Sequence, residues 1–347
     1  QTEQKEQKEE QKKKQTTTKQ RSITAAAAAA AVHFSASSFQ LSLRTSHLGR
    51  CFSRRYTTES TMKDMLNEVQ HGAPHGTLIM SEMQTAGRGR GQGREWESRP
   101  KGNLYFTVLL REESIGTFKS KKNKNKKNAA AGLAAHVHYS VVVAVTRACR
   151  RVGVNARIKW PNDVWLEGRK IGGMLIDVKN DCMMVGIGLN VNENMQENDA
   201  VQTLATSLSD VLIGSRRQVK EEDDDEEDKQ EDKQEDKQED KQEEIISRES
   251  LLADIMNLLE LYLNAFDGTY ASTSKLRERY KTWDLTMGNE ISVQPRDGSS
   301  NEKMFNARAV DIDQKGRLIV DVLLPNDPSD PSDPSDPSDP SEWVRRT

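Results

Sequence analysis

Short apolar runs separated by polar turns recur along the chain, and their lengths predict strands. Thr77–Met80 and Leu104–Leu110 are rich in β-forming side chains and predict two buried strands. Gly172–Val178 and Met183–Val191 predict a further pair, joined by a turn at 179–181. Strands of this kind, interspersed with helices, predict a mixed sheet.

Two longer segments predict helices that cover such a sheet. Val137–Val152 is apolar over most of its length and ends at Gly153, as expected for a helix in a core. Ser250–Phe266 places its leucines on one face, which predicts an amphipathic helix. The alternation of strands and helices indicates an α/β or α+β fold class.

The pattern changes beyond Trp283. Ile291–Val293, Met304–Val310 and Leu318–Leu324 are short strand-like runs joined by polar turns that contain glycine. They predict a small separate β domain over residues 283–347.

Three low-complexity segments interrupt these patterns. Residues 119–128 are a lysine and asparagine run, residues 217–244 carry Glu-Asp-Lys-Gln repeats, and residues 327–341 repeat Asp-Pro-Ser. A proline at every third position excludes helix and sheet ladders from the last segment. We interpret all three as surface insertions, because lengthening a surface loop costs little free energy.

Charge is unevenly distributed along the chain. Glu221–Glu244 holds sixteen acidic residues and four lysines, a net charge of −12, whereas the whole chain carries −3. The remainder is therefore basic, with a net charge of +9. Mild basicity favours anionic ligands, but with only 5% aromatic residues it is weak support for nucleic-acid binding. We expect no nucleic-acid partner.

The sequence also argues against a membrane-spanning protein and against a disulfide-stabilised one. The longest uninterrupted apolar stretch, Ala25–Val32, has eight residues, whereas about twenty are needed to span a bilayer. Cys51, Cys149 and Cys182 are odd in number, far apart and form no Cys-x-x-Cys pair. We therefore expect no membrane partner, free thiols and a reducing compartment.

The N-terminal region allows two interpretations. Residues 1–20 consist of Gln, Lys, Glu and Thr repeats that cannot build a core. Arg21–Thr58 contains no acidic residue and is typical of an organelle transit peptide. Alternatively, the part from Phe34 onward belongs to the folded protein. We predict a cytoplasmic protein, with a mitochondrion or plastid as the alternative.

A glycine-arginine loop follows the strand predicted at 77–80. In QTAGRGRGQGREW, residues 84–96, four alternating glycines let the backbone turn sharply and approach a ligand closely. Arg88, Arg90 and Arg94 add guanidinium groups suited to phosphate or carboxylate. The spacing fits neither a Walker loop nor a dinucleotide-binding fingerprint. We interpret the segment as an ordered anion-binding loop, with a nucleic-acid-binding Arg/Gly loop as the alternative.

Two more segments carry candidate chemistry. Lys159 ends a short strand before a Pro-Asn-Asp turn, which holds its ammonium group where it can neutralise a phosphate or a developing oxyanion. Gly186 and Gly188 alternate along a strand and leave room for a ligand to lie against the sheet. The alternatives are an ordinary surface lysine and a close contact between a helix and the sheet.

Taken in order, three motifs closely resemble the biotin protein ligases, or holocarboxylase synthetases: QTAGRGR at 84–90, KWPNDVWLEGRKIGGML at 159–175 and VGIGLNVN at 185–192. Glu59–Met62 resembles an early Ser-Thr element of that family, and residues 43–50 resemble the lead-in of its eukaryotic members. The resemblance extends over residues 34–266. We therefore expect the eukaryotic type, without the bacterial repressor domain and without a DNA-binding role.

The resemblance implies a fold and a domain order. The fold is a mixed β-sheet flanked by helices, related to class II aminoacyl-tRNA synthetases, with a small SH3-like β domain at the C-terminus. The catalytic domain would occupy residues 34–268, after a disordered or targeting segment at 1–33.

The resemblance also implies a two-step reaction. Biotin and MgATP form biotinyl-5′-AMP and pyrophosphate. A lysine on the biotin carboxyl carrier domain of a carboxylase then takes the biotin and releases AMP. Positioning and electrostatics would supply most of the rate, because the protein has little covalent chemistry to perform.

Roles for individual residues follow from the same resemblance. Lys159 and Arg90 are the expected catalytic residues, with Lys159 meeting the biotin carboxylate and then the α-phosphate. The expected biotin-binding residues are Ser60, Thr61, Met62, Gln84, Arg88, Gly89, Arg90, Lys159, Gly186 and Gly188. The expected ATP-binding residues are Arg88, Arg90, Arg94, Trp96, Lys170 and Asn190.

The chain departs from the family pattern in two places. The glycine-arginine loop is one residue longer between Arg90 and Trp96, and Ser98–Pro100 holds an extra residue. A lipoate ligase or octanoyltransferase, which shares the fold and a similar lysine, is the alternative function. Such enzymes lack the glycine-arginine loop beside the KWPND segment.

Deletion of residues 221–244 tests the interpretation of the acidic repeat as a surface insertion. Because its composition cannot build a core, we expect the shortened chain to transfer biotin at a rate within a few fold of the full chain. The measurement is the initial rate of transfer to a carrier domain, with thermal melting as the control for folding. A folded deletion variant without transfer would contradict the interpretation.

Overall fold

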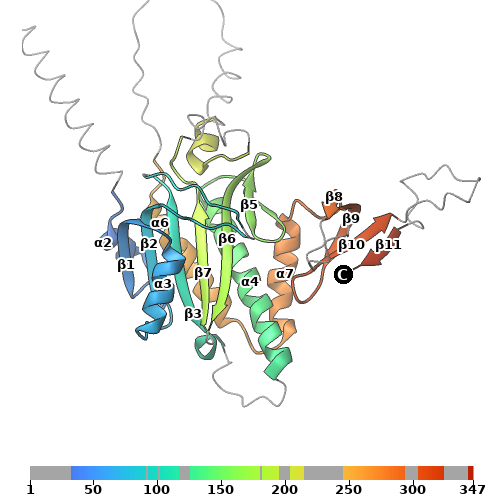
Figure 1. Cartoon of the computed structure of the whole chain (residues 1–347), viewed down its shortest axis with the longest axis horizontal. Helices are drawn as coiled ribbons and strands as arrows, with labels where there is room; N and C mark the ends of the chain where they lie inside the picture. Colours follow the sequence, from blue (N-terminus) through green and yellow to red (C-terminus); the bar gives the residue numbers. More distant parts are fainter. Residues whose placement is uncertain are drawn as a thin grey trace, which may run out of the picture.

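The structure, a computed structural model of the chain, is built around a seven-stranded mixed β-sheet (Figure 1). The strand order is β1-β2-β3-β7-β6-β5-β4; β1 and β2 run parallel, and the other neighbours are antiparallel. The strands are β1 Phe52–Thr58, β2 Leu78–Gln84, β3 Leu104–Arg111, β4 Arg157–Lys159, β5 Asp163–Leu166, β6 Arg169–Lys179 and β7 Cys182–Leu189. The described residues are 33–90, 93–100, 102–116, 126–179, 182–194, 204–214, 245–293, 304–323 and 343–346.

Helices cover both faces of this sheet. α3 (Thr61–Gln70) packs on one face against β2, β3 and β7, and α4 (Lys126–Arg151) and α6 (Arg248–Asn264) lie on the other (Figure 1). α2 (Ala36–Ser42) packs on α6, and α7 (Tyr270–Trp283) packs on α4 and contacts β4. No helix of the described ranges combines the length and the apolar character that crossing a bilayer requires.

The alternation of side chains along the central strands decides which residues face α3. Every second residue of β3 and β7 enters the main core under α4 and α6; these residues are Leu104, Phe106, Val108, Leu110, Val185, Ile187 and Leu189. The residues between them point to the opposite side. Tyr105, Thr107, Gly186 and Gly188 therefore share what we call the α3 face of the sheet.

α6 also holds the segment that precedes β1. Three of its side chains accept backbone N–H groups from this segment: Glu249 from Ser35 at 2.6 Å, Asn257 from Arg44 at 2.7 Å, and Glu260 from Ser46, His47 and Leu48 at 2.6 to 3.1 Å. Phe34 and Phe39 are buried in the main core. Of the two interpretations of the N-terminal region, the structure supports the one in which the chain from Phe34 onward belongs to the fold.

A second, four-stranded antiparallel sheet follows α7 (Figure 1). Its strands, in the order β11-β10-β9-β8, are β8 Glu290–Val293, β9 Phe305–Ile312, β10 Leu318–Leu323 and β11 Trp343–Arg346. Ala307, Val320 and Val322 form a small core of its own. β11 follows the Asp-Pro-Ser repeat in the sequence and pairs with β10. The domain boundaries given above remain predictions.

The structure differs from the sequence-based boundaries in two places. α4 begins at Lys126, inside the 119–128 segment that we expected as a loop, because the alanines at 129–131 favour helix without adding a strong hydrophobic pattern. β2 continues beyond the predicted run at 77–80 as far as Gln84. The repeats at 217–244 and 327–341 and residues 1–32 lie outside the described residues.

A buried ion pair fixes the first turn of α6 to the large sheet. Arg248 Nη1 lies 2.6 Å from Glu82 Oε2 of β2, and the two side chains are 3% and 6% exposed. The same nitrogen donates to the carbonyl of Asn103 at 3.0 Å. Arg54 of β1 approaches the other oxygen of Glu82 at 3.6 Å. This pair joins α6 to β2 and to the entry of β3.

We expect Arg248→Met to lower the free energy of unfolding by about 3 kcal/mol, because it leaves the Glu82 carboxylate buried with only Arg54 nearby. The matched control is Arg151→Met, which breaks an ion pair with Asp254 whose side chains are 50% and 29% exposed. That change should lower the free energy of unfolding by at most about 1 kcal/mol. Urea denaturation measures both, and equal losses would contradict the role of burial.

Candidate active site

A chain of polar side chains crosses the α3 face at the start of α3. The backbone N–H of Thr61 donates to Gln84 Oε1 at 2.9 Å, and the Thr61 hydroxyl lies 3.2 Å from the same oxygen. Thr107 of β3 donates its hydroxyl to Thr61 Oγ1 at 2.8 Å. Ser60, the N-cap residue of α3, is also buried. Three of the predicted biotin-binding residues, Ser60, Thr61 and Gln84, therefore lie together.

Met62 covers the first of the two strand glycines. A Cβ atom on Gly186 would lie 2.8 Å from Met62 Sδ and 3.7 Å from Thr107 Oγ1. Only glycine therefore fits beneath this first turn of α3 without displacing Met62. Gly186 adjoins the Thr61–Thr107 contact and extends that polar site onto β7.

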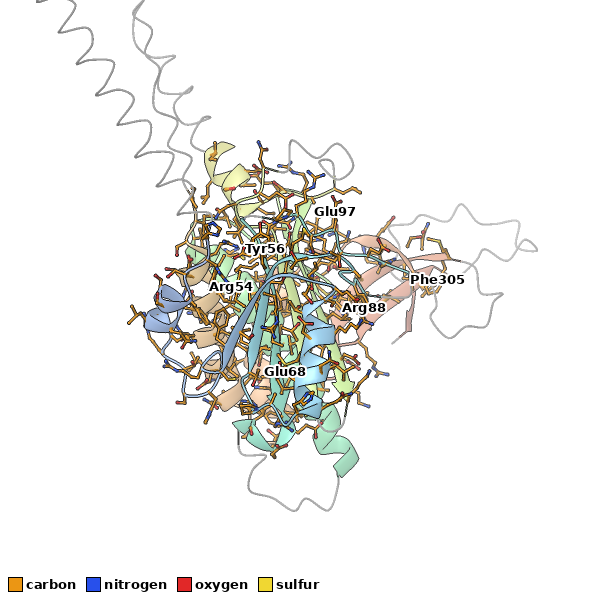
Figure 2. All side chains as sticks on the ribbon, turned by 60° about the vertical axis from the view of Figure 1, so that its left-hand side comes forward. Arg54, Tyr56, Glu68, Arg88, Glu97 and Phe305 are labelled. Carbon is orange, nitrogen blue, oxygen red and sulfur yellow. The ribbon has the colours of Figure 1, made fainter. Side chains whose placement is uncertain are left out.

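The glycine-arginine loop folds into a short hairpin beside this site. Gly89 N–H donates to the Arg94 carbonyl at 2.8 Å, and Trp96 N–H donates to the Gly87 carbonyl at 2.9 Å. A Cβ atom on Gly87 would lie 2.5 Å from the Trp96 carbonyl oxygen, so the two limbs approach closely because residue 87 is glycine. Arg88, on the outgoing limb, is exposed (Figure 2). Arg90 and Arg94 are also exposed; residues 91–92 lie outside the described ranges.

Trp96 ends this hairpin and covers the second strand glycine. A Cβ atom on Gly188 would lie 2.5 Å from the indole ring. The Lys170 ammonium stands over the same ring, 5.3 Å from its centroid. The indole N–H is buried and has no hydrogen-bond partner among the described residues. Trp96 thus lies on the sheet at the position where we expected a ligand to contact Gly188.

Beyond Trp96 and Lys170, charged and aromatic side chains follow one another towards the edge strand β4. Lys170 of β6 lies 2.9 Å from Asp163 Oδ1 of β5. Lys159, the last residue of β4, pairs with Asp163 in the sheet and places its ammonium 3.9 Å from the centroid of the Trp165 ring. The prediction that Lys159 ends a strand is confirmed. The site thus presents two lysines, with one carboxylate between them.

Buried polar groups hold the segment that leaves the hairpin. The hydroxyl of Tyr105 accepts from Asn103 Nδ2 at 2.9 Å and from the backbone N–H of Arg99 at 3.3 Å. Burial raises the pKa of Tyr105 well above its usual value, so the hydroxyl stays neutral. Asn103 Oδ1 accepts the N–H of Val191 at 2.9 Å, which joins this segment to the end of β7.

Asn190 follows β7 and has its amide engaged within the protein. Its Nδ2 donates to the Thr206 carbonyl at 3.1 Å, and its backbone carbonyl accepts from Leu208 N at 3.2 Å. The side chain is buried. In this structure Asn190 therefore anchors the 204–208 segment, and its predicted contact with a nucleotide remains a prediction.

The hairpin connects the two halves of the site. Its first limb starts at Gln84 beside Thr61, and Trp96 on its second limb contacts Lys170. Sequence reasoning missed Thr107 and Tyr105, although these are the two hydroxyl-bearing side chains within the apolar run of β3. Within the described residues, no three His, Cys, Asp or Glu side chains gather closely enough to hold a metal ion.

Comparison with known proteins agrees with this geometry. Residues 54–192, which span the polar site, the hairpin and the lysine row, match the sequence model of the Biotin/lipoate A/B protein ligase family. This segment of the chain is similar to that family.

Two relatives and one solved structure illustrate the similarity. The bifunctional ligase/repressor BirA of Bacillus spizizenii is 30% identical over 181 residues, which cover 50% of this chain and 51% of that protein. The biotin--[acetyl-CoA-carboxylase] ligase of Mycobacterium tuberculosis is 28% identical, over 76% of this chain and 81% of that one. The biotin protein ligase of Aquifex aeolicus, solved with biotin and ATP, superposes with a TM-score of 0.54 at 22% identity, covering 79% and 92%.

The relatives are matched over part of their length, and the solved structure shares the fold. The chain spans about half the length of the BirA relatives it matches. The likeness to the Aquifex aeolicus structure shows a shared fold. It agrees with the predicted mixed sheet flanked by helices and with the small β-sheet at the C-terminal end.

His138 of α4 lies beside the Pro161 backbone of the turn that follows Lys159. Its ring is 6.1 Å from the Tyr280 ring. Burial is the main cause that lowers the pKa of His138 to about 4; the positive charge of Arg90 adds to the shift, and a hydrogen bond with the Pro161 backbone opposes it. The imidazole is therefore neutral at physiological pH and places no second cation beside Arg90.

The lowered pKa of His138 predicts a dependence of stability on pH. Between about pH 6.5 and 4, the His138 imidazole takes up a proton in the unfolded chain but not in the folded chain. His138 therefore lowers the free energy of unfolding as pH falls. His138→Gln should reduce this slope by at most about 1.4 kcal/mol per pH unit. Urea denaturation from pH 7 to pH 4 measures it. His136, whose pKa burial also lowers, remains in both proteins, so only the difference in slope is informative. Identical slopes would contradict the assignment.

Proposed function

We propose that the chain is an ATP-dependent ligase that attaches biotin to a lysine of a carboxylase carrier domain through biotinyl-5′-AMP. The observation that carries the proposal is one continuous site on the α3 face. It places a neutral polar cluster at one end, a glycine-arginine hairpin in the middle and the Lys170–Asp163–Lys159 row at the other end. The neutral ureido ring of biotin suits the polar cluster. The biotin carboxylate and the α-phosphate of ATP suit the hairpin and the lysine row.

In the first step, an oxygen of the biotin carboxylate attacks the α-phosphorus of ATP, and pyrophosphate leaves. Negative charge accumulates around the carboxylate and the α-phosphate as they approach each other. Lys159 offers a compact ammonium there, and the hairpin adds backbone N–H groups with Arg88 and Arg90. Fixed positive groups of this kind lower the barrier mainly by electrostatic stabilisation.

In the second step, the ε-amine of the acceptor lysine attacks the acyl carbon of biotinyl-5′-AMP. An amide bond forms, the bond between the acyl carbon and the phosphate oxygen breaks, and AMP leaves. We assign Arg94, Trp96, Lys170 and Asn190 to the nucleotide side of the intermediate. Mg²⁺ would arrive with the phosphates of ATP.

A lipoate or octanoate ligase is the second candidate, because the family description covers both activities. The cluster of Thr61, Gln84 and Thr107 favours biotin. The ureido ring of biotin offers N–H donors and a carbonyl acceptor to these groups, whereas a dithiolane ring or an alkyl chain offers none. Buried polar groups left without partners discriminate strongly against such a substrate.

We propose the cytoplasm as the compartment. Support comes from Cys51, Cys149 and Cys182, which are all free thiols. The acid-free segment is folded onto α6 from Phe34 onward, so this part of it is not a transit peptide. A mitochondrion or plastid is the alternative.

Lys159→Ala tests the proposed chemistry. We expect the rate of biotin-dependent pyrophosphate release to fall about 10²- to 10³-fold, because one preorganised cation at the reacting atoms is lost. Lys159→Arg should recover only part of the rate, because its guanidinium is longer and planar. Lys275→Ala, an exposed lysine on α7, is the matched control and should match the unaltered chain.

The same assay, run with lipoate or octanoate in place of biotin, separates the two candidate functions. Turnover with lipoate and none with biotin would refute the biotin proposal. Wild-type pyrophosphate release by Lys159→Ala would refute the assigned role of Lys159.

A further inference from the structure

The turn that follows Lys159 is held by groups more than a hundred residues further along the chain. The backbone N–H of Trp160 donates to the hydroxyl of Thr286 at 3.0 Å. The indole N–H of Trp160 donates to the carbonyl of Gly316 at 3.1 Å. Tyr280 donates its hydroxyl to the carbonyl of Pro161 at 3.0 Å. Both residues after Lys159 are therefore fixed from outside the sheet.

The segment after α7 also extends the sheet beyond its edge strand β4. Leu285 N–H donates to the carbonyl of Ile158 at 2.7 Å, and the backbone of Asp284 forms a parallel bridge with Ile158. Asp284 Oδ1 accepts the N–H groups of Thr286 and Met287 at 2.6 and 2.9 Å. This turn fixes the orientation of the Thr286 hydroxyl that meets Trp160.

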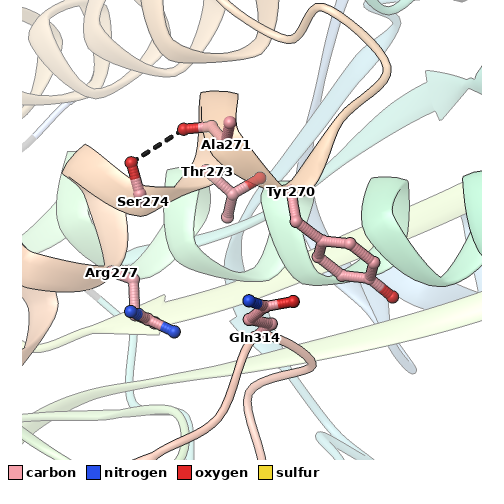
Figure 3. Close-up of a pocket in the computed structure, with 6 residues that line it drawn as sticks. All are labelled: Tyr270, Ala271, Thr273, Ser274, Arg277 and Gln314. Carbon is pink, nitrogen blue, oxygen red and sulfur yellow. Dashed lines mark hydrogen bonds between the residues drawn. The ribbon is translucent and has the colours of Figure 1, made fainter.

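The turn between β9 and β10 supplies the remaining contact. Tyr139 of α4 donates to the carbonyl of Asp313 at 3.1 Å, three residues before Gly316. On its other side, Gln314 and residues of α7 border a cavity of about 200 Å³ (Figure 3). The turn therefore rests on α4 and on the Trp160 indole rather than on α7 at Gln314. Gly316 has φ of +83°, which a side chain would strain.

Lys159 itself has few constraints of its own. Its side chain is exposed, and its ammonium lies 3.9 Å from the centroid of the Trp165 ring. The direction of a long, exposed side chain depends on the backbone that carries it. A displacement of about 1 Å at a reacting group can cost about 10²-fold in rate.

We propose that Thr286 and Trp160 are positioning residues that set the Lys159 ammonium for adenylate formation, with Trp160 acting through the Gly316 carbonyl of the small sheet. The inference rests on the proposed function of Lys159. The small sheet and the segment before it thus contribute to the first chemical step without touching biotin or ATP. They stabilise one conformation of the 159–161 backbone.

The test uses the full chain with Thr286→Ala, Thr286→Ser and Trp160→Phe. We expect Thr286→Ala and Trp160→Phe to lower kcat for pyrophosphate release about tenfold while KM for biotin stays within about twofold, because the Thr61, Gln84 and Thr107 groups that we assign to the ureido ring are left unchanged. Thr286→Ser keeps the hydroxyl and should restore kcat to within about twofold. Thr282→Ala removes an exposed hydroxyl that bonds the Glu278 carbonyl on α7 and is the matched control, with unchanged kcat.

Hydrogen exchange of the 157–166 peptide accompanies the kinetics and should become faster in Thr286→Ala and Trp160→Phe but not in Thr282→Ala. An active wild-type chain with unchanged kcat in Thr286→Ala and Trp160→Phe would overturn the positioning role and leave the proposed function intact. Loss of kcat that Thr286→Ser does not restore would overturn it as well. A wild-type chain that makes no biotinyl adenylate would instead overturn the proposed function on which the inference rests.

Discussion

The buried pair of Arg248 and Glu82 is the interaction on which the geometry of the site depends. Glu82 lies two residues before Gln84 on β2, and the Asn103 carbonyl that Arg248 also binds lies immediately before β3. One guanidinium therefore fixes the two strands that present Gln84 and Thr107 to the α3 face. Two charges taken out of water favour a unique arrangement, since any shift that separates them leaves both without compensation.

The same region explains how the chain accommodates its acidic repeat next to a precise site. Asn192, just after β7, forms a reciprocal pair with the backbone of Ile246, just before α6: Nδ2 donates to the carbonyl at 2.8 Å, and Oδ1 accepts the N–H at 3.0 Å. The ends of the sequence between β7 and α6 are thus joined by protein contacts. Closing a longer loop between joined ends adds little entropic cost.

Local motifs indicated the candidate site, whereas the contacts that hold its segments in place could not be predicted from the sequence. The hairpin and the Lys159 turn were predictable because their glycines, arginines and lysine lie within short segments of unusual composition. Thr286 and Tyr280 gave no comparable signal, because their partners are more than a hundred residues away. The strands β4 and β5 have three and four residues, too short for a period-2 pattern to identify, although the end of β4 at Lys159 was expected. Helix α4 started earlier than predicted because alanine favours helix without contributing an apolar stripe.

The contacts between α6 and the segment before β1 set a lower limit on how far this protein can be trimmed. Glu260 is buried, and its carboxylate depends on the N–H groups of Ser46, His47 and Leu48. Proteolytic maturation or a shortened expression clone that removed this segment would take three hydrogen bonds from Glu260 and expose the core residues that Phe34 and Phe39 cover. A cleavage site compatible with the folded chain therefore lies ahead of Phe34, and an affinity tag is best attached there.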